Sequence, residues 1–215
     1  MESATPELPA GSAMRAASKR SETLLLAVFF LSGVSALIYQ VAWQRLLFGA
    51  FGVDIESITI VVSTFMLGLG CGALAGGQLA DRLGHRTIEL FAACELGIGL
   101  FGIISPHLIP AVGAYFLQSS LPVIAAVNFL LILVPASFMG ATLPMLVAHL
   151  FRGNASVGVS ISKLYWSNTM GAAFGALAAG VLLFQYFTLN QSIYLAAAGN
   201  FIVASVVFLA RSKEA

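Results

Sequence analysis

The chain is organised around the stretch Gly68-Leu-Gly-Cys-Gly-Ala-Leu-Ala-Gly-Gly-Gln-Leu-Ala-Asp-Arg-Leu-Gly-His-Arg86. Gly68, Gly72 and Gly76 recur at every fourth residue, so on a helix they form one smooth stripe against which another backbone can pack closely. The residues from Asp81 onwards then gather charges of both signs in a chain that has few. This pattern predicts an apolar helix with a docking face, followed by a polar turn.

The composition indicates the class of protein. Of the 215 residues, 59% are hydrophobic and 9% are charged, and the mean hydropathy is +0.95. In soluble proteins about one quarter of the residues are charged. Apolar runs of about 20 residues recur along the chain, and each is long enough to cross the hydrocarbon core of a bilayer. We therefore expect an all-α membrane protein with the lipid bilayer as its surroundings and no nucleic-acid partner.

The apolar runs predict six transmembrane helices and short polar ends. The predicted spans are residues 23–47, 58–80, 88–104, 121–150, 157–184 and 192–210. Residues 1–22 are predicted to be a disordered cytoplasmic tail, 23–211 the six-helix domain and 212–215 a second cytoplasmic tail. A cleaved signal peptide is the alternative for the first span. Residues 111–120 are predicted to lie at the membrane interface, because they are too few to span it.

The prolines of the fourth span leave its form open. Pro135 and Pro144 each remove one backbone hydrogen bond, so residues 121–150 are either one kinked helix or two segments.

The basic residues support this count of spans. With the N-terminus inside, nine of the ten Lys and Arg residues fall on the cytoplasmic side, as the positive-inside rule requires. Arg45 is the exception, and we interpret it, beside Trp43, as an anchor at the outer interface. We therefore expect a multi-pass protein of the bacterial inner membrane with both termini in the cytoplasm.

Two features resemble one half of a major facilitator transporter. Gly171 and Gly175 in the fifth span repeat the spacing of the stripe in the second span, as two inverted three-helix repeats would. Residues 77–86 resemble the Gly-x-Leu-Ala-Asp-Arg-x-Gly-Arg-Lys signature between helices two and three of that family, with His85 and Arg86 at its last two positions. The resemblance implies a half-transporter-like bundle of three plus three helices.

A second resemblance covers almost the whole chain. Its four ordered blocks are Ser32-Gly-Val-Ser-Ala-Leu-Ile-Tyr-Gln-Val-Ala-Trp-Gln-Arg-Leu-Leu47, Glu95-Leu-Gly-Ile-Gly99, Met139-Gly-Ala-Thr-Leu-Pro144 and Leu164-Tyr-Trp-Ser-Asn-Thr-Met-Gly-Ala-Ala-Phe-Gly175. These blocks resemble the membrane region of fused spermidine synthase-like proteins, in which a helical part precedes an aminopropyltransferase-like domain. The sequence lacks that domain's glycine-rich strand-to-helix turn, so we expect no enzyme and no cofactor. A separate aminopropyltransferase-like chain would supply catalysis.

Glu95 is the main candidate for a functional residue. It is predicted about 10 Å inside the third span, at a depth where a carboxylate is costly unless it is protonated or paired. Lys163 is predicted at a similar depth, so the two form a possible ion pair. With Gln40, Gln44 and Asn168 they make up our substrate-binding or proton-coupling candidates.

Other polar residues receive structural interpretations. The major facilitator resemblance implies a cytoplasmic charge clamp of Asp81, Arg82 and Arg86. Asn128, Asn168 and Asn200 are expected to form hydrogen bonds between helices. The cysteines and histidines are dispersed, and no metal site is expected.

The sequence favours two functions. The first is a half-transporter-like protein that binds or moves a small solute as a homo- or hetero-oligomer, with a homodimer docked through the stripe of Gly68, Gly72 and Gly76. The alternative is a non-catalytic accessory or scaffold subunit of a larger membrane complex, or an anchor for a separate spermidine synthase-like enzyme. One half of a split enzyme is a third possibility. The substrate is not predicted.

Overall fold

The computed structural model describes residues 9–51, 55–116, 118–151 and 157–211, and every regular element in this part is helical. The elements are α1 (Pro9–Phe51), α2 (Ile55–Arg82), the short 3₁₀ helix η1 (Gly84–Arg86), α3 (Thr87–Phe116), α4 (Leu121–Phe151), α5 (Val157–Ala178), the π-helical turn η2 (Ala179–Leu183), α6 (Phe184–Tyr186) and α7 (Leu189–Arg211). Six stretches are long and apolar enough to cross a membrane, by length and composition. The prediction of six long apolar helices is confirmed.

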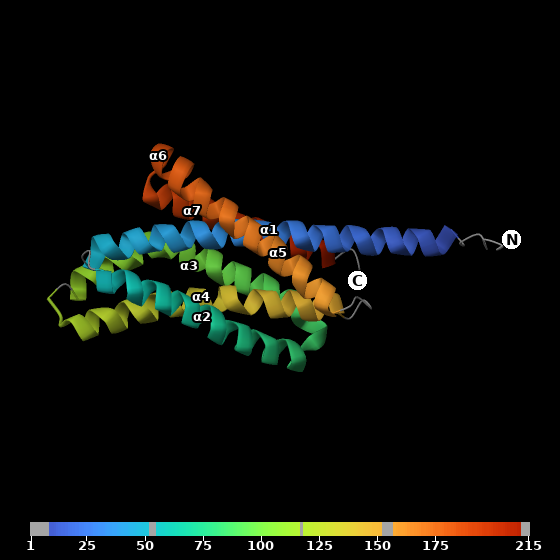
Figure 1. Cartoon of the computed structure of the whole chain (residues 1–215), viewed down its shortest axis with the longest axis horizontal. Helices are drawn as coiled ribbons and strands as arrows, with labels where there is room; N and C mark the ends of the chain where they lie inside the picture. The colour runs from blue at the N-terminus through green and yellow to red at the C-terminus, as the bar shows by residue number, and fades with distance from the viewer. Residues whose placement is uncertain (1–8, 52–54, 117, 152–156, 212–215) are drawn as a thin grey trace.

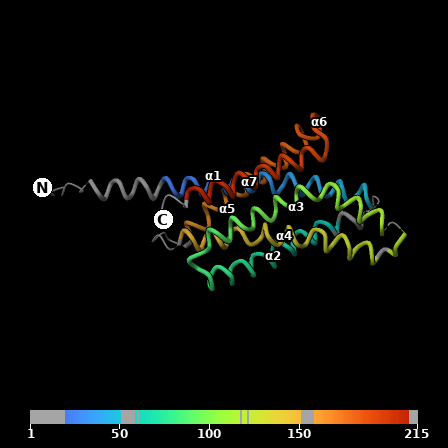
Figure 2. Tube along the Cα trace, turned by 180° about the vertical axis from the view of Figure 1, so that it is seen from behind, coloured from blue at the N-terminus to red at the C-terminus, as the bar shows by residue number. Residues whose placement is uncertain are grey.

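The long helices run lengthwise through one bundle, and they pack in pairs. The most extensive contacts join α2 to α4, α1 to α5, and α3 to α7. In both views α2 and α4 form one side of the bundle, α1, α5 and α7 form the other, and α3 lies between them (Figures 1 and 2). Helix α3 therefore has neighbouring helices on more than one side.

Glycine sets the spacing of the α2–α4 pair. Gly72 lies against the backbone of Ser137, and Gly76 lies against the backbone of Ala141. On the facing helix, Gly140 lies against the backbone of Leu69. A methyl group at any of these glycines would overlap the neighbouring backbone, so only glycine allows this approach.

The α1–α5 pair repeats these three contacts. Gly171 lies against Phe30, Gly175 against Val34, and Gly33 against Asn168. One constant shift in residue number relates the contacting residues of α2 to those of α5, and a second constant shift relates those of α4 to those of α1. Gly171 therefore corresponds to Gly72, and Gly175 corresponds to Gly76. A pairing of Gly171 with Gly68, the first glycine of the stripe in α2, would be wrong by one helical turn.

The stripe in α2 is not a free docking face. Gly68, Gly72 and Gly76 are buried, and all three lie against α4 of the same chain. The predicted dimer contact through this stripe is therefore wrong. The small residues do bring two backbones together, as expected, but the partner helix is internal.

Helix α3 is continuous through Phe116, so residues 111–116 of the predicted interface segment belong to the same helix as the third span, and their place at the interface stays a prediction. Pro106 and Pro110 both lie inside the helix. Pro106 cannot donate a hydrogen bond to the Gly102 carbonyl, and the Ser105 hydroxyl donates to that carbonyl instead, at 2.9 Å. The freed carbonyl is satisfied locally, which allows the helix to continue.

Helix α4 settles the question that Pro135 and Pro144 left open, because it is a single helix that contains both prolines. Its close packing on α2 extends from Ala136 to Ala141, between the two prolines. This contact holds the segment that joins the two halves of the helix.

The N-terminal region also differs from the prediction. Helix α1 begins at Pro9, so residues 9–22 of the predicted disordered tail are helical. Proline is favoured at the first helical position, and the Ala, Lys and Arg residues that follow have high helix propensity. The apolar helix therefore extends backwards into this segment. Residues 1–8 and the predicted tail at 212–215 lie outside the described residues.

Candidate functional site

Glu95 lies on the first half of α3, inside the bundle, with no exposed surface. One carboxylate oxygen, Oε1, accepts a hydrogen bond from Ser32 Oγ of α1 at 2.6 Å. The other, Oε2, accepts a hydrogen bond from Asn200 Nδ2 of α7 at 2.7 Å. The carboxylate thus joins three helices that are far apart in the sequence.

Both hydrogen-bond donors to Glu95 are neutral. Among the side chains that the structure describes, no Lys, Arg or His forms an ion pair with this carboxylate. Removing a carboxylate from water costs several kcal/mol when no charge opposes it, about 2.5–3.5 kcal/mol at the centre of a spanning helix on insertion scales. The site therefore suits a cation or a proton.

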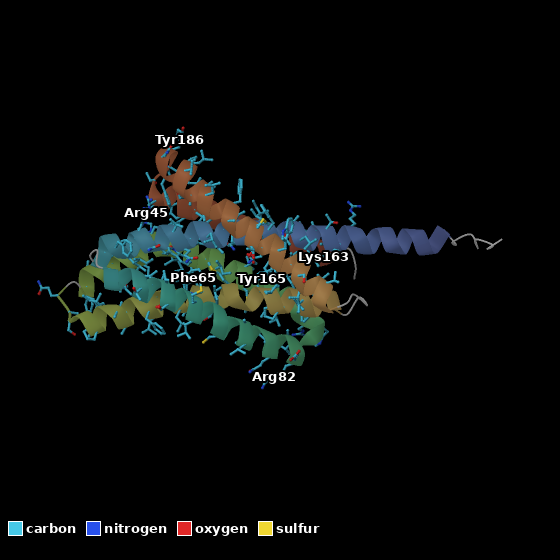
Figure 3. All side chains as sticks on the ribbon, in the orientation of Figure 1. Arg45, Phe65, Arg82, Lys163, Tyr165 and Tyr186 are labelled. Carbon is cyan, nitrogen blue, oxygen red and sulfur yellow. The ribbon has the colours of Figure 1, made fainter. Side chains whose placement is uncertain are left out.

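A cavity of about 280 Å³ adjoins this cluster. Both donors to Glu95, Ser32 and Asn200, are in its wall. The remaining lining residues come from α1, α2, α3, α4 and α5: Ala36, Leu37, Gln40, Phe65, Met66, Leu69, Ile98, Met139, Thr142 and Asn168. Phe65 lies between the ends of the bundle marked by Arg45 and Lys163 (Figure 3). The cavity is thus mainly apolar, with a polar wall backed by Glu95.

Asn200 lines the cavity and carries an unused, buried acceptor. Its side chain is 1% exposed. Its amide nitrogen is committed to Glu95, whereas Oδ1 is buried and has no hydrogen-bond partner in the described part of the chain. A buried amide oxygen without a donor is unfavourable, so this position suits a ligand that donates hydrogen bonds.

The structure brings some of the predicted site residues together and separates others. Gln40 and Asn168 line the cavity beside the Glu95 cluster, whereas Gln44 is not in its wall. Lys163 is exposed and pairs with Glu22 Oε1 of α1 at 2.6 Å. The predicted Glu95–Lys163 ion pair is wrong, because Lys163 lies in the early turns of α5 where Glu22 is its neighbour.

Sequence reasoning missed two of the residues at the site. Ser32 was noted for the resemblance and not as a partner of Glu95. Thr142 lines the cavity and donates to the Met139 carbonyl at 2.7 Å. Asn200 was expected to form a hydrogen bond between helices, and its bond to Glu95 is of that kind. A small polar residue in an apolar span was the available signal for all three.

The other predicted polar groups lie away from the cavity. Asp81, Arg82 and Arg86 are exposed around the turn between α2 and α3, and the charge clamp stays a prediction. Trp43 is not an interface anchor, because its buried indole Nε1 donates to Ser105 Oγ at 2.8 Å. Arg45 lies over the Phe184 ring, 4.2 Å from its centroid. Among the described residues, no group of three His, Cys, Asp or Glu could hold a metal ion.

Comparison with known proteins gives the relatives of this chain. It is 29% identical over 197 residues to the polyamine aminopropyltransferase of Mycobacterium tuberculosis (strain ATCC 25618 / H37Rv), a match that covers 89% of this chain and 36% of that protein. The chain is similar to polyamine aminopropyltransferases. Polyamine aminopropyltransferase 1 of Streptomyces coelicolor is 28% identical over 193 residues, and that of Oceanobacillus iheyensis is 22% identical over 190 residues. No family model and no solved structure matches.

The chain spans little more than a third of the length of these relatives. Their names agree with the spermidine synthase-like resemblance. They contradict the predicted function, since they name enzymes and not transporters. The prediction of a half-transporter is therefore wrong, and the relatives give no support to the accessory-subunit or anchor alternative.

Proposed function

We propose that this chain is the membrane-embedded helical part of a polyamine aminopropyltransferase-like protein, and that the polyamine of that protein is its ligand. The observation that carries the proposal is the extent of the match. It covers 89% of this chain, which is nearly all of the six-helix bundle, and 36% of the first relatives. We infer that aminopropyl transfer belongs to the larger part of the relatives that lies outside the match.

The outer surface of the bundle supports embedding in a membrane. Large apolar side chains on several helices are exposed, among them Leu74 at 71% and Trp166 at 66%. Soluble monomers rarely expose apolar patches larger than a few hundred Å². Glu95 and its two donors, by contrast, are inside. Apolar residues outside and polar residues inside is the arrangement that lipid favours.

The ends of the bundle support an orientation. Arg82 and Lys163 lie toward the end at which α7 finishes, whereas Arg45 and Tyr186 lie at the opposite end (Figure 3). The positive-inside rule assigns the first end to the cytoplasm. We therefore place both termini on the cytoplasmic side of a bacterial inner membrane.

The paired glycine contacts support two equivalent halves. The α2–α4 and α1–α5 pairs use corresponding glycines, and α3 and α7 pack against each other. We infer two repeats of three helices, as in the inverted repeats of one transporter half. The likeness concerns the architecture, and the proposal involves no movement of solute across the membrane.

A labelling experiment tests the membrane part of this proposal. His85→Cys and Tyr186→Cys, each made in a Cys71→Ser, Cys94→Ala background, place one thiol at each end of the bundle. We expect an impermeant maleimide to label Tyr186→Cys in intact cells and His85→Cys only after lysis. The cysteine-free parent is the control. Recovery of the chain in the soluble fraction, or the reverse labelling pattern, would contradict the proposal.

A chimera tests the connection with aminopropyl transfer. The matched segment of the Mycobacterium tuberculosis relative is replaced by this chain, and transfer to putrescine is measured by mass spectrometry of the products. We expect the chimera to be active in membranes and the chain alone to be inactive. A well-expressed, membrane-bound chimera without activity would count against the proposal, as would transfer by the chain alone.

A further inference from the structure

We propose that the cavity beside Glu95 binds the primary ammonium group of an aliphatic amine. The ammonium group donates hydrogen bonds to the amide oxygens of the lining side chains Gln40, Asn168 and Asn200, and the Glu95 carboxylate behind Ser32 and Asn200 provides the opposing charge. The inference rests on the proposed function for the identity of the amine, a polyamine. It adds the site and the mode of recognition, and it concerns binding only.

The charges and acceptors around the cavity favour a cation. Glu95 is fully buried, and among the described side chains its hydrogen-bond donors are Ser32 and Asn200, both neutral. Asn200 lines the cavity, and its buried Oδ1 lacks a donor among the described residues. Gln40 and Asn168, which also line the cavity, carry further amide oxygens that can accept hydrogen bonds. An anion would meet the carboxylate unfavourably, and a neutral apolar molecule would donate to none of these oxygens.

The remaining walls favour an alkyl ammonium ion over a metal ion. Calcium takes six to eight oxygen ligands, and magnesium requires near-ideal octahedral coordination. A single carboxylate behind a mainly apolar wall does not supply such a set. Leu37, Phe65 and Ile98 instead provide apolar surface for the methylene groups of an amine. A volume of about 280 Å³ lies near the lower limit for small-molecule pockets, which suits a short linear diamine.

Two basic side chains of the described chain have partners other than Glu95. Lys163 is paired with Glu22, and Arg45 lies over the ring of Phe184. Because no described side chain forms an ion pair with Glu95, we assign the opposing positive charge to the ligand.

Equilibrium dialysis with radiolabelled putrescine tests the inference on the purified full chain in lipid nanodiscs. We expect saturable binding, and a loss of at least about tenfold in affinity for Glu95→Gln, because a neutral amide lacks the opposing charge. Asn200→Ala should also weaken binding. Asn190→Ala is the matched control, since Asn190 is exposed on the same helix α7, and it should bind as the parent does.

Competitors identify the recognised group. Excess n-butylamine should displace putrescine, whereas n-butanol, of similar length but uncharged, should not. Equal displacement by the alcohol, unchanged affinity in folded Glu95→Gln, or no saturable binding to the parent chain would each overturn the inference.

A second variant keeps the test decisive if Glu95→Gln or Asn200→Ala does not fold. Ala36→Phe fills the cavity from α1 without removing any member of the Glu95 cluster, and we expect it to abolish binding. Retained binding in this variant would place the amine elsewhere and overturn the inference. Failure here is distinct from failure of the proposed function, which the labelling and chimera experiments measure without any ligand in this cavity.

Discussion

Gly72→Ala is the substitution whose effect the structure defines best. The added Cβ would lie 2.7 Å from the carbonyl carbon and 2.8 Å from the Cα of Ser137, whereas ordinary van der Waals contacts are 3.4–4 Å. Both neighbouring atoms belong to the backbone, so no side-chain rotation relieves the overlap. Helices α2 and α4 must separate locally by about 1 Å, which forfeits a quarter to a half of the attraction across each affected contact.

We expect Gly72→Ala to lower the free energy of unfolding by about 1–3 kcal/mol, the usual cost of overpacking. Alanine is a better helix former than glycine by up to about 1 kcal/mol in water. That gain is small here, because helices of this kind stay formed in the detergent-unfolded state. The assay is unfolding by sodium dodecyl sulfate from mild detergent, followed by the fluorescence of the buried Trp43.

Gly70→Ala is the matched control on the same helix. A Cβ at Gly70 would meet no atom within 4 Å, so we expect a change within about 0.5 kcal/mol. Gly171→Ala, which meets the Phe30 backbone in the α1–α5 pair, should cost as much as Gly72→Ala. Equal stability of Gly72→Ala and Gly70→Ala would refute the reasoning that backbone contact, and not glycine content, sets the helix spacing.

Two further predictions concern buried and exposed polar contacts. Ser105→Ala removes the acceptor of Trp43 Nε1 and the donor to the Gly102 carbonyl, and we expect a loss of about 1–3 kcal/mol in the same assay. Adding Pro106→Ala should recover part of that loss, since residue 106 then donates to Gly102; no recovery would show that the carbonyl does not need this donor. Lys163→Met breaks an ion pair whose side chains are 50% and 35% exposed, so we expect a loss below about 1 kcal/mol that salt diminishes further. A larger, salt-independent loss would mean that the pair is more buried than the structure indicates.

The sequence by itself determined the number and nature of the helices. Six apolar runs, two of them with glycines at every fourth position, were sufficient, because hydropathy and local spacing act within a single segment. The same local evidence could not give the end of α3. Pro106 reads as a helix stop until Ser105 is seen to donate to the Gly102 carbonyl and accept from Trp43.

The candidate site was predictable only in part. Glu95 stood out because a carboxylate in an apolar run is costly, and Gln40 and Asn168, predicted with it, line the cavity beside it. Its partners were not predictable, since Ser32 and Asn200 lie on helices that meet α3 only in the folded bundle.

Tertiary structure also decided what the glycine stripes contact. A stripe of small residues specifies close approach but not the partner, so a second chain and α4 of the same chain were equally consistent with the sequence. The correspondence of Gly72 with Gly171 likewise required the facing backbones of Ser137 and Phe30. The spacing of residues along one helix is a local property, whereas the choice of partner depends on how all six helices share the interior.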